Sequence, residues 1–460
     1  MRAPRTACGR LALVVVLAAA VTAFTATVPL LRDWFDLRVY HGAVDAWVHH
    51  GGRLYDYRVP GTPYGFTYPP FAAVTMLPMA LLGLGAAVAL CLLLDLAALA
   101  WVLRVLAGPS WRRHGWYGAA LAACVLALYE PLRDTVSFGQ VNVLLLALVL
   151  TDAWLLATGR TRWAGVGIGL AAAVKLTPAL FIGLLLLARR PRAAGLATAV
   201  AVAATGFAAL VAPDASRFYW TEAMWDTGRV GRLDYVSNQS LQGVLARLGV
   251  GGHTVWAVCA LAVLAVWARR SRRAGAAGDW PAAFALTGLT ACLVSPVTWV
   301  HHLVWVLPAF AVLLRAGHPR VAGALYAVMC TSVVWLWFDD ASGVDGFLGA
   351  NTYTWVTLGL LLFLPADQVP AERRSRHRSP SATAAAPRQA APTTATASGQ
   401  PGRSSSCAVA GAATGAAGTA AGPGPGPGLG GAARGASSDP TGSTLPAAAN
   451  PQSSSARASS

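Results

Sequence analysis

Residues 34–68, WFDLRVYHGAVDAWVHHGGRLYDYRVPGTPYGFTY, form a polar and aromatic stretch between two strongly apolar parts of the chain. The stretch contains five tyrosines and three histidines and, together with Asp33 just before it, holds four aspartates. The whole chain has only 19 acidic residues, so carboxylates are concentrated here. We therefore predict a loop that carries the chemistry of the protein, with Asp36 as the leading catalytic candidate.

The sequence on both sides of this stretch indicates a membrane protein. Hydrophobic residues make up 55% of the chain and charged residues 12%, and the mean hydropathy is +0.52, whereas an ordinary soluble domain has about 25% charged residues. Apolar runs that approach the roughly 20 residues needed to cross a bilayer recur from residue 11 to about residue 365. We predict an all-α, polytopic membrane domain over residues 1–370, with about ten to twelve transmembrane helices.

The basic residues indicate how the chain is oriented in the membrane. The net charge is +16, and arginines gather in short clusters between the apolar runs. Such clusters mark cytoplasmic connections, so we interpret the charge as topology and expect no nucleic-acid partner. The first apolar run, residues 11–31, resembles a signal peptide, but its length and the spans that follow favour an uncleaved helix. We expect a cytoplasmic N-terminus, an active site outside the plasma membrane, and the lipid bilayer as a partner.

Residues 371–460 differ in composition from the rest. They are rich in Ala, Gly, Ser, Thr and Pro and include GPGPGPG at residues 422–428. Such a segment cannot bury enough apolar surface to offset the entropy lost on ordering. We predict a disordered cytoplasmic tail without catalytic residues.

Lys175 is the single lysine among 35 basic residues. It lies inside the apolar run 163–188, where the sequence KLTP at residues 175–178 predicts a break in a helix. An ionisable group in a membrane segment costs about 2.5–3.5 kcal/mol, which favours a functional reason for its presence. Contact with a phosphate or a lipid head group is one interpretation, and a snorkelling or helix-pairing lysine is the other.

Two pairs of amide side chains precede apolar runs. Gln140 and Asn142 belong to FGQVN, and Asn238 and Gln239 belong to SNQS. Amides in such positions cap a helix, bond to a neighbouring helix or bind sugar hydroxyls, and the sequence leaves these roles open. Asn238 also lies in an N-Q-S glycosylation sequon, which is a weak pattern by itself.

His301 and His302 follow SPVTWV at the expected outer end of a helix. Adjacent helical residues point about 100° apart, so the two would seldom bind one metal ion. One of them bonding to a phosphate oxygen or a substrate hydroxyl is one interpretation, and a plain interfacial histidine is the other. The seven cysteines form no C-x-x-C pair, and no metal-ligand spacing is present, so we expect no metal and no cofactor.

Asp36 lies a few residues beyond the end of the first expected helix, where the membrane surface meets water. A carboxylate at such a position can take a proton from a sugar hydroxyl, which is the work of a general base. A solvated loop aspartate without a catalytic role is the alternative.

Six short motifs occur in an order that resembles a known family. They are FDLRVY (35–40), YPPF (68–71), FGQVN (138–142), KLTP (175–178), SNQSLQG (237–243) and SPVTWVHH (295–302). Together they resemble glycosyltransferase family 87, the polyprenol-phosphate-mannose-dependent α-(1→2)-mannosyltransferases of actinobacteria, which have the GT-C membrane fold. The likeness covers roughly residues 11–364, and the tail has no counterpart in it.

The resemblance implies an enzyme that moves mannose, with inversion, from a polyprenyl-phosphate donor to a glycolipid or lipoglycan acceptor. Asp36 would be the general base, Lys175 would lie at the helix break, and His301 or His302 would lie near the donor phosphate or the acceptor. A lipid-monophosphate donor also removes the need for a nucleotide site with its metal. Further donor or acceptor contacts would come from the remaining motif residues, which are Tyr40, Tyr68, Gln140, Asn142, Asn238 and Gln239.

Two other functions are compatible with the sequence. A transferase of the same fold could use a different polyprenyl-phosphate sugar, such as decaprenyl-phosphoarabinose, because nothing in the sequence fixes the sugar. A transporter of a lipid-linked sugar would be expected to show internal repeats with paired broken helices. The sequence shows one break, at Lys175, and the aspartate-rich stretch fits an enzyme better.

Overall fold

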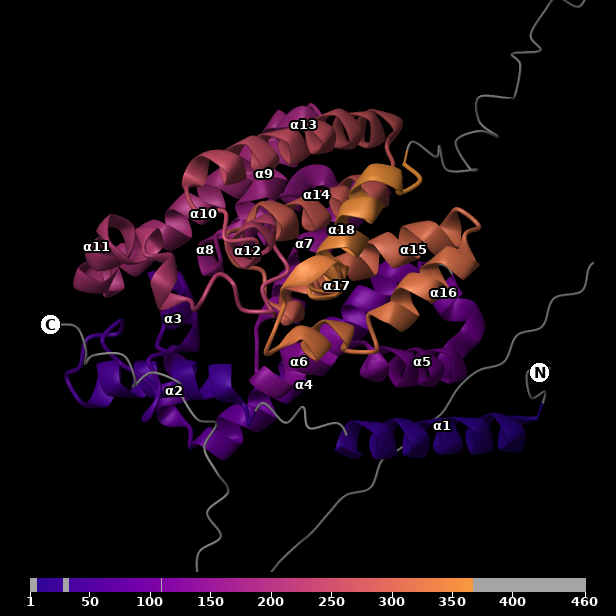
Figure 1. Ribbon diagram of the computed structural model, residues 1–460, viewed down its shortest axis with the longest axis horizontal. Helices are drawn as coiled ribbons and strands as arrows, with labels where there is room; N and C mark the ends of the chain where they lie inside the picture. The colour runs from indigo at the N-terminus through magenta and orange to yellow at the C-terminus, as the bar shows by residue number, and fades with distance from the viewer. Residues whose placement is uncertain (1–5, 28–32, 109, 367–460) are drawn as a thin grey trace, which may run out of the picture. The chain divides into compact units, whose positions relative to one another are not determined.

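The computed structural model describes residues 6–27, 33–108 and 110–366, and every regular element in these ranges is a helix (Figure 1). The α-helices are α1 (Ala7–Thr27), α2 (Phe35–His49), α3 (Pro70–Met76), α4 (Leu84–Ala107), α5 (Ser110–Leu128), α6 (Glu130–Phe138), α7 (Asn142–Thr158), α8 (Val166–Val174), α9 (Leu180–Leu187), α10 (Pro191–Val211), α11 (Pro213–Thr221), α12 (Leu241–Arg247), α13 (His253–Ala277), α14 (Trp280–Val294), α15 (Leu307–Arg315), α16 (Pro319–Val328), α17 (Gly343–Gly349) and α18 (Thr352–Phe363). Short 3₁₀ helices are η1 (Leu77–Leu81), η2 (Thr161–Trp163), η3 (Thr177–Ala179), η4 (Ala223–Trp225), η5 (Thr227–Arg229), η6 (Val300–Val306) and η7 (Val333–Trp337). The predicted all-α class is confirmed, and the prediction for the tail, residues 371–460, lies outside the described residues.

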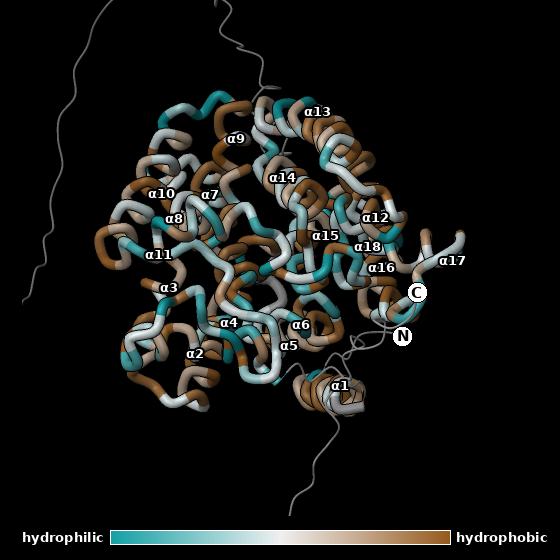
Figure 2. The backbone as a smooth tube through the Cα atoms, turned by 60° about the vertical axis from the view of Figure 1, so that its left-hand side comes forward, coloured by the Kyte–Doolittle hydropathy of each residue, from teal (hydrophilic) through white to brown (hydrophobic). Residues whose placement is uncertain are grey.

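Several helices are suited to cross a membrane. Within the described ranges, α1, α4, α10 and α13 are long and apolar enough to span a bilayer. Two bent pairs, α6 with α7 at 118° and α17 with α18 at 57°, count as two further spans if each pair crosses once. Figure 2 shows the hydrophobic colour along helices such as α1 and α10. The chain is therefore a multi-pass membrane protein, while the number of ten to twelve spans stays a prediction.

Helix α14 forms the centre of the main hydrophobic core. Nearly all of its side chains are buried, and α7, α9, α13, α15 and α18 pack around it (Figure 1). A helix that is apolar on all sides is stable only when neighbours cover every face. Its two polar core residues, Thr287 and Thr290, bond to the carbonyls four residues earlier, and Thr287 also accepts a hydrogen bond from the indole of Trp267 at 2.9 Å. Both buried threonines of α14 thus have hydrogen-bond partners.

The prediction of a loop is wrong for the first half of residues 34–68, because residues 35–49 fold into α2. Leu37, Tyr40 and Val44 recur at spacings of three and four residues and bury one face of this helix. Asp36, His41, Asp45 and His49 on the same helix obscured this period. The buried face packs against aromatic residues of the following loop and against α3, in a second hydrophobic cluster.

The break predicted at residues 175–178 is confirmed. Lys175 and Leu176 separate α8 from η3 and α9. Pro178 has no N–H for the Val174 carbonyl four residues earlier, and Lys175 has an extended backbone (φ −147°, ψ 131°), so α8 ends at Val174.

Candidate active site

A cavity of about 680 Å³ lies where α2, the ends of α6 and α8, and the segment before η6 meet. Helix α6 turns into α7 through residues 139–141, and the α8 break and the segment before η6 are two further interruptions. Interrupted helices expose backbone and polar side chains, which membrane proteins tolerate where the chain lines a cavity. The predicted site residues that line this cavity are Asp36, Tyr40, Tyr68, Gln140, Lys175, His301 and His302.

A directed chain of hydrogen bonds ends on the carboxylate of Asp36. The Tyr40 hydroxyl donates to the Tyr68 hydroxyl at 3.1 Å, and the Tyr68 hydroxyl donates to Gln140 Oε1 at 2.7 Å. Gln140 Nε2 then donates to Asp36 Oδ2 at 2.6 Å. Tyr68 and Gln140 each accept one hydrogen bond and donate the next, so the amide of Gln140 is oriented with its donors toward the carboxylate. This arrangement holds Asp36 in the orientation of an acceptor facing the cavity.

The position of Asp36 depends on contact between the start of α2 and the end of α6. Asp36 lies in the first turn of α2, where the helix dipole favours a negative charge. The Trp34 N–H donates to the Ser137 carbonyl at 3.0 Å. Gly139, which ends α6 with φ +70°, allows close approach, because a Cβ there would lie 2.6 Å from Leu37 Cβ. The glycine of FGQVN therefore brings Gln140 within reach of Asp36.

Burial controls the acidity of Asp36. Loss of contact with water raises the pKa of Asp36 to about 6, although the hydrogen bond from Gln140 and a positive charge on Lys175 both lower it. A carboxylate with a pKa near 6 is ionised at neutral pH and is a stronger base than an exposed aspartate.

Lys175 lies among three polar partners. Its Nζ is 3.3 Å from the Tyr68 hydroxyl, 3.1 Å from Asn142 Oδ1 and 2.8 Å from His302 Nε2. The Tyr68 ring also faces this nitrogen at 5.0 Å from the ring centre. Through Tyr68, the lysine belongs to the same network as Asp36. The network joins one acidic and one basic side chain across a cavity. Hydrogen bonds with neighbouring side chains hold both of them in position.

Hydrogen bonds to the His301 carbonyl hold the histidine pair in place. The His301 carbonyl accepts hydrogen bonds from Thr135 Oγ1 at 2.9 Å and Asn142 Nδ2 at 3.3 Å. The His301 ring packs edge-on against Phe138 and His302, with ring centres 5.2 Å and 4.7 Å apart. Among the residues that the structure describes, no group of three or more His, Cys, Asp or Glu side chains could hold a metal ion.

The structure does not bring Asn238 and Gln239 to the cavity. Both are fully buried. Asn238 Nδ2 donates to the Pro296 carbonyl at 3.2 Å, and its Oδ1 accepts from the Thr298 N–H at 2.9 Å. Gln239 Nε2 donates to the Ala350 carbonyl at 2.7 Å. These contacts tie the SNQS segment to the residues before η6 and position the cavity wall.

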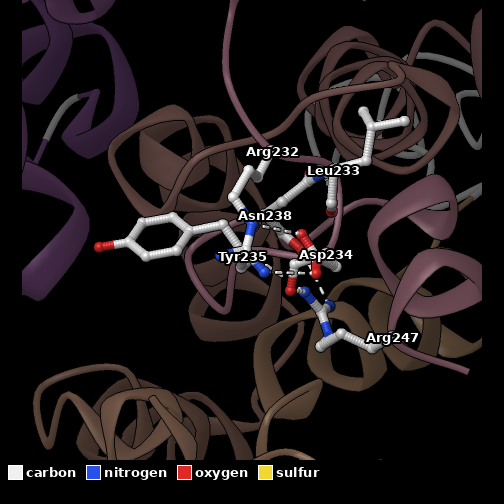
Figure 3. Close-up of polar contacts among 6 residues, drawn as sticks. All are labelled: Arg232, Leu233, Asp234, Tyr235, Asn238 and Arg247. Carbon is white, nitrogen blue, oxygen red and sulfur yellow. Dashed lines mark hydrogen bonds and ion pairs between the residues drawn. The ribbon is translucent and has the colours of Figure 1, made fainter. Parts of the chain in front are cut away.

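Arg247 binds the backbone of the loop that forms this cavity wall. Its guanidinium donates to the carbonyls of Tyr235 and Asn238, each at 2.9 Å. Figure 3 shows this guanidinium directed at the backbone of the loop, while the Tyr235 ring points the other way. Arg232, by contrast, pairs with Asp234 at 2.7 Å on the exposed side. The arginine thus fixes the loop that carries cavity-lining residues.

Sequence reasoning missed several residues that line the cavity. The charged ones are Asp226, Arg229 and Arg232, and the two arginines lie in the sequence RVGR. Arg229 donates to the Tyr55 carbonyl at 2.6 Å, and its guanidinium lies 5.3 Å from the centre of the Phe218 ring. Two arginines three residues apart, just before the SNQS motif, were the available signal. The uncharged ones include Tyr64, Ser237, Ser295, Trp299 and Trp335.

Comparison with known proteins gives one family. The model of glycosyltransferase family 87 matches residues 66–296 of this chain. The matched region includes Tyr68, Gln140, Asn142 and Lys175, while Asp36 precedes it and the histidine pair follows it. No solved structure gave a significant match.

Curated relatives carry closely related names. The polyprenol-phosphate-mannose-dependent alpha-(1-2)-phosphatidylinositol pentamannoside mannosyltransferase of Mycobacterium tuberculosis is 35% identical over 62% of this chain and 67% of its own length. The enzyme of the same name from Mycolicibacterium smegmatis is 37% identical over 68% of this chain and 77% of its own length. A phosphatidylinositol mannoside mannosyltransferase from M. smegmatis, with the same donor and linkage in its name, is 37% identical over 62% of this chain and 70% of its own length.

Proposed function

The chain belongs to glycosyltransferase family 87, and on that premise we propose that it transfers mannose from polyprenyl-phosphate-mannose to a glycolipid or lipoglycan acceptor and forms an α-(1→2) linkage. The names of relatives with 35 to 37% identity support this donor and linkage. The observation that carries the mechanism is that one cavity presents both the Asp36 carboxylate and the pair of Lys175 and His302. Its volume of about 680 Å³ is within the usual range for small-molecule sites.

The proposed reaction is a single displacement. Asp36 takes the proton of the acceptor hydroxyl while that oxygen forms a bond to C1 of mannose. The bond between C1 and the phosphate oxygen breaks, and its electron pair stays on the phosphate. Attack from the face opposite the phosphate inverts the configuration at C1, so no covalent sugar–enzyme intermediate is needed. Negative charge develops on the phosphate, where Lys175 and His302 can stabilise it with hydrogen-bond donors.

The acceptor is proposed to be a mannosylated phosphatidylinositol. The names of the relatives specify phosphatidylinositol mannosides. Such a lipid carries a phosphodiester, and planar guanidinium groups bind phosphate oxygens through two parallel hydrogen bonds. Arg229 and Arg232 line the cavity and are the candidates for that contact, in which the phosphate would take the place of Asp234 on the Arg232 guanidinium.

The reaction is proposed to take place at the outer face of the plasma membrane, with the N-terminus and the tail in the cytoplasm. The distribution of arginines between the apolar runs supports this orientation.

A transfer assay tests the proposal. Purified full-length protein in lipid nanodiscs is given labelled polyprenyl-phosphate-mannose and a mannosylated phosphatidylinositol, and NMR of the product identifies the linkage. We expect a new α-(1→2)-linked mannose. Faster transfer from decaprenyl-phosphoarabinose would show that this lipid, and not polyprenyl-phosphate-mannose, is the donor. Movement of labelled lipid across the bilayer without any transfer would refute the enzymatic function.

The rate of transfer should depend on the ionisation of Asp36. Because burial raises the pKa of Asp36 to about 6, the carboxyl becomes protonated and inactive as a base when the pH falls below that value. We expect kcat to fall about tenfold per pH unit below about pH 6, as a single essential base in the enzyme–substrate complex requires. Gln140 donates to the carboxylate, so Gln140→Leu should move this limb to higher pH. A rate that is constant from pH 5 to 8 would contradict the assignment.

A further inference from the structure

The hydrogen-bond partners of Lys175 determine how many protons its side chain carries. The Tyr68 hydroxyl commits its proton to Gln140, so it can only accept from Lys175. Asn142 commits its NH₂ group to the His301 carbonyl, which turns its Oδ1 toward the lysine as a second acceptor. Two N–H bonds of Lys175 are therefore used as donors. The third contact, with His302 Nε2 at 2.8 Å, decides between an ammonium and an amine.

The backbone fixes the tautomer of His302. The Trp299 N–H donates to His302 Nδ1 at 3.2 Å, and a peptide N–H cannot accept. Nδ1 must therefore be unprotonated, which leaves the ring proton of the imidazole on Nε2 and excludes the imidazolium form. Nε2–H then points at Lys175 Nζ, so Nζ has to accept through a lone pair. An ammonium has three donors and no lone pair, whereas an amine has two donors and one lone pair, which matches the three contacts.

We propose that Lys175 is an uncharged amine in the empty site and takes up one proton when the phosphate of the donor lipid binds against it and His302. The inference rests on the proposed function for the identity of the ligand, but its first half concerns the empty site alone. Proton uptake breaks no bond in the donor, and the proton comes from solvent in the cavity. In the complex, a phosphate oxygen accepts the hydrogen bond from His302 Nε2–H in place of the lone pair of Lys175 Nζ. The phosphate also accepts a hydrogen bond from the N–H that Lys175 gains.

This exchange of partners links donor binding to the base. A positive charge on Lys175 lowers the pKa of Asp36, so donor binding favours the ionised carboxylate that the reaction needs. An empty site without that charge keeps Asp36 easier to protonate. The titratable groups that face Lys175 are Asp36 on α2, Tyr68 before α3, Cys292 on α14 and His302 on η6.

The single lysine makes this state directly measurable. Protein labelled with ¹⁵N and ¹³C lysine carries one lysine side chain, so its NMR signals report the protonation of Lys175 without overlap. The sample is full-length protein in nanodiscs at neutral pH. Spectra are recorded alone, with polyprenyl-phosphate-mannose in the absence of acceptor, and with polyprenol that lacks phosphate. Lys175→Arg, in which the signal must disappear, confirms the assignment.

We expect the chemical shifts of an amine in the empty site and with polyprenol, and those of an ammonium with the phosphodiester. The phosphodiester keeps one negative charge across this pH range, so its own titration does not contribute. An ammonium in the empty site would overturn the first half of the proposal, and an amine that persists with bound donor would overturn the second. Amine shifts in a protein that neither binds the donor nor transfers mannose would refute the proposed function while supporting the uncharged lysine.

Discussion

Replacing Asp36 by asparagine is expected to reduce mannosyl transfer by about 10²- to 10⁴-fold, which is the usual contribution of a general base. Asparagine has the same shape and can still accept a hydrogen bond from Gln140, so the network that now joins Gln140 Nε2 to Asp36 Oδ2 at 2.6 Å should persist. What is lost is the ability to take the proton of the attacking hydroxyl. The loss should appear in kcat, while the KM for the donor changes little.

A matched control lies on the same helix. Asp45 also belongs to α2, pairs with His50 at 3.3 Å, and does not line the cavity. Asp45→Asn should therefore retain activity within about twofold, because a surface pair of this kind contributes little to stability. Full transfer by Asp36→Asn, or an equal loss in both variants, would remove Asp36 from the mechanism.

Gly139→Ala is expected to disrupt the site through its backbone. The residue has φ +70°, which costs a non-glycine residue about 1–2 kcal/mol. The new Cβ would lie 2.6 Å from Leu37 Cβ, closer than two carbon atoms can pack, and overpacking adds about 1–3 kcal/mol. Relief of this clash pushes α2 away from α6 and separates Asp36 from Gln140. We expect a lower thermal unfolding midpoint together with a large loss of transfer.

Gly159 provides the control for the backbone effect. It ends α7 with φ +77°, and a Cβ there would meet nothing within 4 Å. Gly159→Ala therefore carries the conformational cost without the clash. Its unfolding midpoint should fall less than that of Gly139→Ala, and its transfer rate should stay close to that of the unsubstituted protein. Equal behaviour of the two variants would show that contact between α2 and α6 is unimportant.

The sequence predicted the class of fold well because membrane insertion imposes a simple rule. Long apolar runs and arginine clusters are readable in one dimension, and so is the break at Lys175. Helix α2 was missed because its apolar face is interleaved with aspartates and histidines. Contacts with residues far along the chain, such as Phe66, stabilise that face.

The candidate site was predicted as a set of residues but not as an arrangement. The hydrogen bond between Gln140 and Asp36 joins positions 104 apart, and the contact between Lys175 and His302 joins positions 127 apart. No local pattern encodes such distances. Asn238 and Gln239 resemble Gln140 and Asn142 in sequence, yet tertiary packing gives the first pair backbone partners and the second pair places in the network. The protonation of Lys175 needed atomic contacts to be inferred.

The most direct test is a cryo-electron microscopy map of the Asp36→Asn protein in nanodiscs with polyprenyl-phosphate-mannose bound. We expect phosphate density within hydrogen-bond distance of Lys175 Nζ and His302 Nε2, with C1 of mannose directed toward the side chain at position 36. Donor lipid bound elsewhere, with these three side chains facing an empty cavity, would contradict this mechanism.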